Sequence, residues 1–229
     1  MPGAWSLRMH EHHIAVTRTA RYATLGPDDG SSRDVWFVLH GQGQLAARFV
    51  RHFEPLDDGS RLVVAPEALS RHYLDRASAP AGEPPRVGAT WMTRDDREAE
   101  ISDYVAYLDA LAARVFERIP REGARLTVLG FSQGAATASR WAALGTTRVD
   151  RLVCWGGAIA HDIPLGVGAT GLHGARLTLV AGTRDEYATT AALALEERRL
   201  RAAGLACDVR LYDGGHRIER ATLAALAAE

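Results

Sequence analysis

A serine on a predicted strand–turn–helix junction is the clearest candidate for chemistry in this chain. Ser132 lies in the segment 130–134 (Gly-Phe-Ser-Gln-Gly), between a short apolar run at 125–129 and a helix-like run at 135–144. On such a junction the serine Oγ is pushed out above the sheet, and the helix N-terminus lies beneath the oxygen that becomes negative during acyl transfer. The pattern therefore predicts a nucleophilic serine.

An aspartate and a histidine follow two later predicted strands. Asp185 comes shortly after the apolar run at 177–181, and His216 follows the run at 207–212. The carboxyl ends of parallel strands open on one edge of a sheet, so we expect both side chains to lie near Ser132. The order Ser, Asp, His is that of an α/β-hydrolase triad, in which the histidine is the general base and the aspartate holds its other ring nitrogen.

Other residues compete for the acid and base roles. Glu186 and Asp213 are alternative carboxylates, and Asp185 could also be a helix or turn cap. His161 and His173 are alternative bases, but both precede the strand that leads to the acid. Chain order therefore favours the first assignment.

An acyl-transfer site also needs two backbone N–H groups to bind the oxyanion. One is expected from Gln133, the residue after the nucleophile, and the other from the glycine-rich loop 40–43 that follows the predicted strand at 35–39. The glycines allow amides to turn inward, and we predict that Gln42 supplies the second N–H. His40 is predicted to be a hydrogen-bonded structural residue.

Strand, loop and helix alternate from about residue 33. The predicted strands are 35–39, 61–65, 125–129, 151–155, 177–181 and 207–212, and the predicted helices are 45–53, 95–119, 135–144, 189–203 and 218–228. Within 1–30, the runs 13–18 and 21–25 predict antiparallel strands, and 66–93 is predicted to be irregular. We expect a single α/β-hydrolase domain over 1–229, with a mostly parallel sheet of about eight strands, helices on both faces and no large cap domain.

Composition argues against several classes of partner. The chain has 229 residues, 47% of them hydrophobic, with 27 basic and 28 acidic residues and a net charge of −1. This balance creates no field to attract nucleic acid or an anionic membrane, and no apolar run is long enough for a signal peptide or membrane span. We expect a cytoplasmic monomer or homodimer. Cys154 and Cys207 fall on strands separated by the one at 177–181, which predicts two buried free thiols.

Four motifs in order resemble one known family. They are His-Gly-Gln-Gly at 40–43, the serine segment 130–134, Gly-x-x-Asp at 182–185 and Tyr-Asp-Gly-Gly-His at 212–216. From about residue 33 onward the chain resembles the phospholipase/carboxylesterase family of α/β hydrolases, which includes small bacterial carboxylesterases and acyl-protein thioesterases. The resemblance implies a serine hydrolase that cleaves small-molecule esters through an acyl-enzyme, without cofactor or metal. Acyl-thioesters and lysophospholipids are the alternative substrates.

The predicted site has no room for a large lid. Only about twenty residues, 156–175, join the strand after the nucleophile helix to the next one, so we expect an open cleft and short to medium acyl chains. The predicted substrate-binding residues are Leu45, Trp91, Met92, Trp155 and Ile159. The sequence departs from the family pattern around Trp91 and at Trp155, so these residues would shape the acyl pocket in a manner particular to this chain.

Three other interpretations of the sequence fit its motifs less well. His10, His12 and His13 could bind a metal, but clustered histidines at a terminus are more often a solvated surface. The segment 41–46 also fits the Gly-x-Gly-x-x-Ala pattern of dinucleotide-binding oxidoreductases, although two strands precede it and the triad is left unexplained. A non-catalytic binding scaffold would not need three triad residues.

Overall fold

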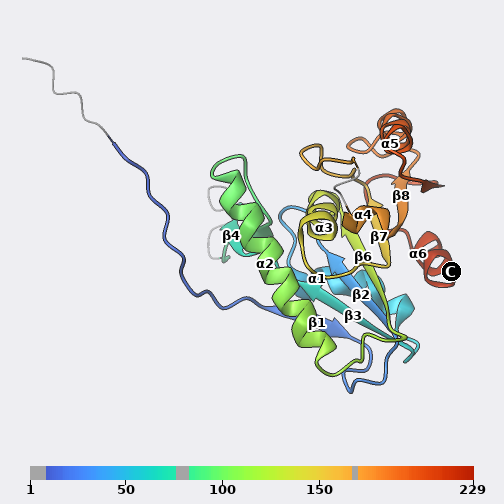
Figure 1. Cartoon of the computed structure of the whole chain (residues 1–229), viewed down its shortest axis with the longest axis horizontal. Coiled ribbons are helices and arrows are strands. Elements are labelled where there is room, and N and C mark those ends of the chain that lie inside the picture. Colours follow the sequence, from blue (N-terminus) through green and yellow to red (C-terminus); the bar gives the residue numbers. More distant parts are fainter. Residues whose placement is uncertain (1–8, 76–82, 167–169) are drawn as a thin grey trace, which may run out of the picture.

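The computed structural model describes residues 9–75, 83–166 and 170–229, and a seven-stranded sheet forms its centre. Its strands are β1 (Tyr22–Leu25), β2 (Asp34–Leu39), β3 (Arg61–Pro66), β6 (Arg125–Phe131), β7 (Arg151–Trp155), β8 (Arg176–Gly182) and β9 (Cys207–Tyr212). They lie in the order β1-β3-β2-β6-β7-β8-β9, with β1 antiparallel to β3 and the other neighbours parallel (Figure 1). The mostly parallel α/β fold predicted from the sequence is confirmed.

Helices cover both faces of this sheet. They are α1 (Ala46–Phe49), which continues as the 3₁₀ helix η1 (Val50–Leu56), α2 (Arg97–Phe116), α3 (Gln133–Leu144), α4 (Thr170–His173), α5 (Thr190–Ala202) and α6 (Arg220–Ala227). Buried side chains of α2, α3 and α5 pack on one face, and those of α1, η1 and α6 pack on the other.

Strand β2 shows why a continuous apolar run belongs at the centre of such a sheet. Successive side chains of a strand point to opposite faces, so Phe37 and Leu39 enter the core beneath α2 and α3, whereas Trp36 and Val38 enter the core beneath α1 and α6. All four are completely buried. A strand covered on both faces therefore has no polar alternation.

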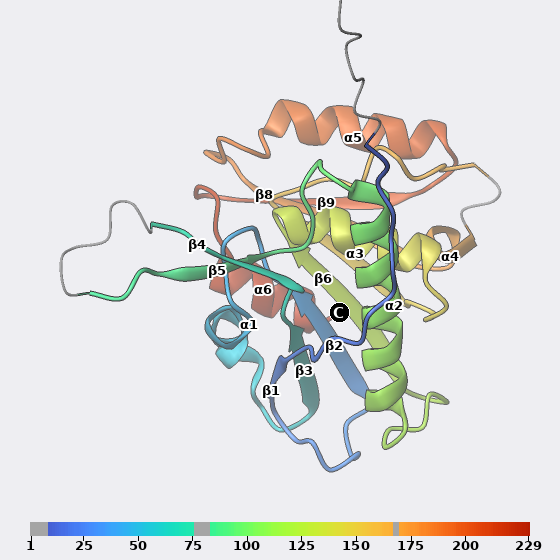
Figure 2. The same cartoon turned by 90° about the vertical axis from the view of Figure 1, so that its left-hand side faces the viewer.

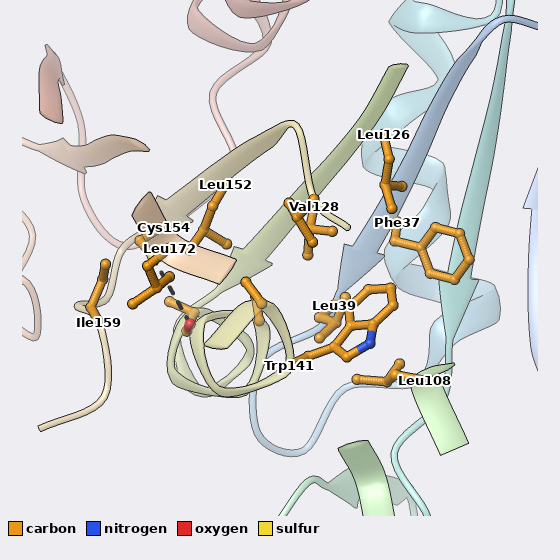
Figure 3. Close-up of a cluster of buried hydrophobic side chains, with 14 of the residues drawn as sticks. Phe37, Leu39, Leu108, Leu126, Val128, Trp141, Leu152, Cys154, Ile159 and Leu172 are labelled. Atoms are coloured by element: carbon orange, nitrogen blue, oxygen red, sulfur yellow. Dashed lines mark hydrogen bonds between the residues drawn. The ribbon is translucent and has the colours of Figure 1, made fainter. Parts of the chain in front are cut away.

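The core beneath α3 is centred on a tryptophan. Figure 3 shows the indole of Trp141 lying between Phe37 and Leu108, and the ring centroids of Trp141 and Phe37 are 5.2 Å apart. The indole N–H donates to Asp109 Oδ1 at 2.8 Å. The same carboxylate accepts hydrogen bonds from the backbone and hydroxyl groups of Thr146 and Thr147, so it ties α2 to the segment that follows α3.

Asp109→Ala is expected to lower the free energy of unfolding by about 2–4 kcal/mol, because it leaves a buried indole N–H and two backbone N–H groups without their acceptor. Burial would raise the pKa of Asp109, but the hydrogen bonds from Thr146, Thr147 and Trp141 outweigh it and the pKa is lowered. The stabilisation is therefore present above the unfolded-state pKa, about 3.9, and is lost as the pH falls through the lower folded-state value.

Urea denaturation at several pH values measures this effect. Asp103→Ala is the matched control, because Asp103 is an exposed residue of the same helix. The control is expected to stay within about 0.5 kcal/mol of the wild type. Equal stability of the two variants at pH 7 would contradict the assigned role of Asp109.

A small antiparallel hairpin lies within the stretch that was predicted to be irregular. Strands β4 (Ser70–Tyr73) and β5 (Val87–Thr90) pair with each other, and Figure 2 shows them projecting away from the main sheet. The sequence did not reveal β4 because none of its four side chains is buried, so the strand has no apolar pattern. Strand β5 contains Gly88 because any Cβ there would overlap the backbone of Gly43. Residues 76–82 of this stretch lie outside the described residues.

The predicted N-terminal pair of strands is wrong in part, and the sheet has seven strands where about eight were expected. Strand β1 matches the predicted run at 21–25, whereas 13–18 has no regular structure in the described chain. Ile14 and Val16 are 86% and 77% exposed, so this alternating segment has no apolar surface to cover. Residues 1–8 lie outside the described residues.

The two cysteines lie as predicted on strands separated by β8, and both are free. Cys154 is buried, but Cys207 is only half-buried on the edge strand β9, which corrects the expectation of two buried thiols. Burial raises the pKa of the Cys154 thiol far above its ordinary value, so it is a packing residue.

Candidate active site

Ser132 occupies a sharp turn between β6 and α3. Its backbone angles are φ 55° and ψ −118°, an unusual region for a residue other than glycine. Glycine is required on both sides, because a Cβ at Gly130 would overlap the carbonyl oxygen of Gly134, and a Cβ at Gly134 would overlap that of Leu39. The backbone N–H of Ser132 donates to Trp155 O at 2.8 Å, which fixes the turn against β7.

The predicted acid and base are in contact. His216 Nδ1 lies 2.8 Å from Asp185 Oδ2, and the Asp185 side chain has no solvent exposure. Because an ionised carboxylate only accepts hydrogen bonds, Nδ1 carries the proton and Nε2 of neutral His216 is left with a lone pair. The His216 ring lies against Phe131, the residue before Ser132, with ring centroids 4.7 Å apart. The structure therefore brings the acid–base pair to the turn that carries Ser132.

The environment of Asp185 keeps it ionised. Its Oδ1 accepts hydrogen bonds from the backbone N–H groups of Tyr187 and Ala188, both at 2.9 Å. Burial would raise the pKa of Asp185, but the hydrogen bonds from Ala188, His216 and Tyr187 outweigh it, so the pKa lies below its ordinary value. A charged Asp185 fixes the tautomer of His216 and stabilises the imidazolium.

The rival acids and bases lie elsewhere. Asp213 forms an exposed ion pair with Arg184, and the Glu186 side chain is exposed. His161 is exposed, and His173 lies 3.3 Å from a backbone carbonyl oxygen. Among the described residues, Asp185 is the carboxylate that contacts the candidate base.

The loop after β2 lies against Ser132. A Cβ placed on Gly41 would be 3.2 Å from Ser132 Cβ. The N–H of Gly41 donates to Gln44 Oε1 and that of Gly43 to Ala89 O, both at 2.8 Å. Within residues 9–75, 83–166 and 170–229, the N–H groups of Gln42 and Gln133 have no acceptor, which leaves the two predicted oxyanion donors available.

His40 is the buried structural residue that was predicted. Its Nε2 accepts from the backbone N–H of Ala68 at 3.1 Å, and Nδ1 lies 2.7 Å from Gly41 O. Nε2 must be unprotonated to accept, so the ring is neutral with its proton on Nδ1. Burial lowers the pKa of His40 and favours this neutral form. Both nitrogens are occupied, so His40 is unsuited to be a base.

The side chain of Gln133 has a role that sequence reasoning missed. Its Oε1 accepts from Trp91 N–H at 3.1 Å, and its Nε2 donates to Thr90 Oγ1 and Met92 O, both at 2.9 Å. The Trp91 indole N–H in turn donates to His40 O at 2.8 Å. These bonds join the Ser132 turn and the loop after β2 to one segment, 90–92, which fixes the positions of the two predicted oxyanion donors.

Two of the predicted substrate-binding residues are core residues. Trp91 and Trp155 are 2% and 0% exposed, so neither presents a surface to a ligand, and the prediction that they shape the acyl pocket is wrong. The indole N–H of Trp155 donates to Arg217 O at 2.9 Å, and the hydroxyl of Tyr212 donates to the same oxygen at 2.6 Å. Trp155 therefore holds the loop that carries His216.

The other three predicted residues lie near two cavities. Leu45 lines a cavity of about 230 Å³ between the loop after β2 and the β4–β5 hairpin. Ile159 lines a cavity of about 510 Å³, formed by the segment after β7 together with α2 and α3. Met92 is half-buried beside the second cavity, and its sulfur accepts from Arg140, which lines that cavity.

The parts of the chain that the structure describes contain no cluster of three or more His, Cys, Asp or Glu residues suited to hold a metal ion. His13 Nε2 instead lies 3.0 Å from Asp96. The dinucleotide pattern at 41–46 does not form the expected site, because the Gly43 N–H is bonded to Ala89 and α1 has only four residues. In the same described parts, no helix has the length and hydrophobicity needed to cross a membrane.

Comparison with known proteins shows the fold of the chain. No protein-family profile matches the sequence, and no curated protein matches it. Among solved structures, it is similar to a carboxylesterase from Mesorhizobium loti (TM-score 0.67, 22% identity, 91% of this chain and 93% of that one). It is also similar to acyl-protein thioesterase 2 from Zea mays (TM-score 0.67, 20% identity, 92% and 97%) and to a phospholipase/carboxylesterase from Dyadobacter fermentans (TM-score 0.63, 16% identity, 94% and 98%). The chain has the α/β-hydrolase fold.

Proposed function

We propose that this protein is a serine hydrolase that cleaves carboxylic esters of short to medium acyl chains through an acyl-enzyme on Ser132. The observation that carries the proposal is the Asp185–His216 pair at 2.8 Å, placed against the strained turn of Ser132. The fold shared with carboxylesterases and a thioesterase supports an ester or thioester as the substrate.

In this mechanism the Ser132 hydroxyl attacks the ester carbonyl carbon while His216 Nε2 takes its proton. The N–H groups of Gln42 and Gln133 bind the oxyanion of the tetrahedral intermediate. The intermediate collapses as His216 protonates the departing alcohol, which leaves the acyl group on Ser132. Water then attacks the acyl carbonyl carbon while His216 Nε2 takes its proton. His216 returns this proton to Ser132 Oγ as the carboxylic acid leaves.

The larger cavity supports a limit on acyl-chain length. A Cβ on Gly157 would be 2.7 Å from the backbone oxygen of Ser132, and residues that follow Gly157 line the cavity, so we propose this cavity as the acyl pocket. Its near lining is apolar, formed by Ala136, Ala158 and Ile159. Arg140 and Asp162 also line it, and they form an ion pair at 2.9 Å. An alkyl chain that reached this ion pair would remove the exposed part of its charge from solvent without a compensating hydrogen bond, so we propose that longer acyl chains are disfavoured.

A panel of p-nitrophenyl esters of increasing chain length, run beside acyl-thioesters, tests the activity and the pocket together. We expect butanoyl and hexanoyl esters to be preferred over dodecanoyl esters and over emulsified triglyceride. Ala136→Leu narrows the cavity and should lower kcat/KM for hexanoyl much more than for acetyl esters, by about fourfold for each methylene no longer accommodated, from about 0.8 kcal/mol per methylene.

Leu45→Phe is the matched variant, because Leu45 lines the other cavity. If Leu45→Phe gives the chain-length effect and Ala136→Leu does not, the acyl chain occupies the cavity beside the hairpin. Faster hydrolysis of emulsified long-chain triglyceride than of soluble butanoate would contradict the short-chain assignment.

A further inference from the structure

The candidate base lies between two aromatic rings. The His216 ring centroid is 4.7 Å from that of Phe131, at an interplanar angle of 35°, and 4.8 Å from that of Tyr187, at 53°. Phe131 is a core residue at 6% exposure, whereas Tyr187 is 80% exposed. Tyr187 therefore gains little from burial where it stands, and its ring contact is with the base.

The backbone and the side chain of Tyr187 reach the same acid–base pair. Its N–H donates to Asp185 Oδ1 at 2.9 Å, while its ring lies against His216. The backbone hydrogen bond holds Tyr187 beside the pair independently of its side chain. The ring can therefore be changed without removing a hydrogen-bond donor to the Asp185 carboxylate. Sequence reasoning had no signal for this residue, because only the fold brings its ring to His216.

During the proposed reaction His216 becomes positively charged each time it takes the serine proton. The face of an aromatic ring is electron-rich and attracts a cation, and such contacts at exposed sites favour the charged form modestly. A ring against His216 also restricts rotation of the imidazole about its Cβ–Cγ bond, which preserves the contact of Nδ1 with Asp185.

We propose that Tyr187 is a positioning residue for the general base, and that its ring and that of Phe131 hold His216 and stabilise its protonated form. The inference rests on the proposed function, and it goes beyond it by assigning a role to a residue outside the triad.

The charged residues next to the base in the two loops are unchanged in the test. Asp185 contacts His216 directly, and the neighbouring charged residues of the two loops are Arg184, Asp213, Glu186 and Arg217. Arg184 and Asp213 neutralise each other in an ion pair. Substitutions confined to the side chain of Tyr187 leave all of these charges in place.

The test compares three variants by the pH dependence of kcat/KM for p-nitrophenyl butanoate. Tyr187→Phe keeps the ring and should match the wild type. Tyr187→Leu keeps apolar bulk without the ring, so the protonated base loses stabilisation and the midpoint of the acidic limb should move to lower pH by about 0.4–0.7 units. Plateau kcat/KM should fall about two- to fivefold, with the change in kcat rather than KM. Tyr22→Leu, at the far edge of the sheet, is the control and should change neither.

Titration of the His216 ring protons by NMR gives the same comparison without turnover. A Tyr187→Leu profile that coincides with the wild type, or an equal shift in Tyr187→Phe, would overturn the inference. Failure of the proposed function itself is distinguished by the wild type, which would then neither hydrolyse the ester nor form an adduct on Ser132.

Discussion

Ser132→Ala is expected to lose about 10⁴- to 10⁶-fold in kcat for p-nitrophenyl butanoate, because the variant has no atom to form the acyl-enzyme. His216→Ala should cost a similar factor, since the hydroxyl then has no base. The double variant should be little worse than either single one, because the two residues act as a unit and removing either abolishes the same step.

Controls for this result are available in the same chain. Ser102 is an exposed residue of α2, and His173 is exposed in α4, so Ser102→Ala and His173→Ala should keep wild-type activity. If Ser132→Ala protein, produced free of wild-type enzyme, retained a tenth of the wild-type rate, Ser132 would not be the nucleophile.

Asp185→Asn is expected to cost about 10⁴-fold in kcat while the fold is kept. The amide oxygen of asparagine can still accept hydrogen bonds from the N–H groups of Tyr187 and Ala188, so the turn keeps both hydrogen bonds. The amide NH₂ would then face Nδ1 of His216 and donate to it, which moves the ring proton to Nε2. The base would lose the lone pair that it needs, although every side chain stays in place.

The rival carboxylates provide the comparison for this variant. Asp213→Asn breaks an exposed ion pair with Arg184, and Glu186→Gln changes an exposed side chain, so each should keep activity within a few-fold of the wild type. Circular dichroism and urea midpoints establish that all three variants are folded. Near-full activity of Asp185→Asn together with a large loss in either rival would mean that the acid had been assigned wrongly.

The parts of the fold that could be predicted from sequence are those in which the pattern of apolar and polar side chains is compatible with only one arrangement of buried residues. Strand β9 was predicted with its observed bounds, and β2 to within one residue, because each begins and ends at a clear change in pattern. The sequence could predict that an acid and a histidine would lie near the Ser132 turn, because chain order and strand ends determine where these residues meet. The contact of Asp185 with His216, rather than a contact of Glu186 or Asp213, could not be determined from chain order alone and required the geometry.

Other features depend on packing that a single sequence does not encode locally. A tryptophan at the end of a strand has the same pattern whether it faces a cleft or the core, and Trp91 and Trp155 were therefore assigned to the pocket although they are buried. The hairpin β4–β5 was missed because its polar strand pairs only with its neighbour. Tyr187 was missed because the role of an exposed aromatic residue depends on what its ring contacts, and its contact with His216 exists only in the folded chain.

The most direct test of the central claim is to trap the covalent intermediate. The protein is mixed with p-nitrophenyl butanoate, quenched in acid within the first turnovers, digested with trypsin and analysed by mass spectrometry. Ser132 lies in the tryptic peptide 126–140, which also contains Ser139, so fragmentation must separate the two serines. We predict a butanoyl group on Ser132 in the wild type and none on this peptide in Ser132→Ala protein. His216→Ala protein should accumulate less of the adduct than the wild type. Turnover without an adduct on this peptide, or an adduct on Ser139 alone, would contradict catalysis by Ser132.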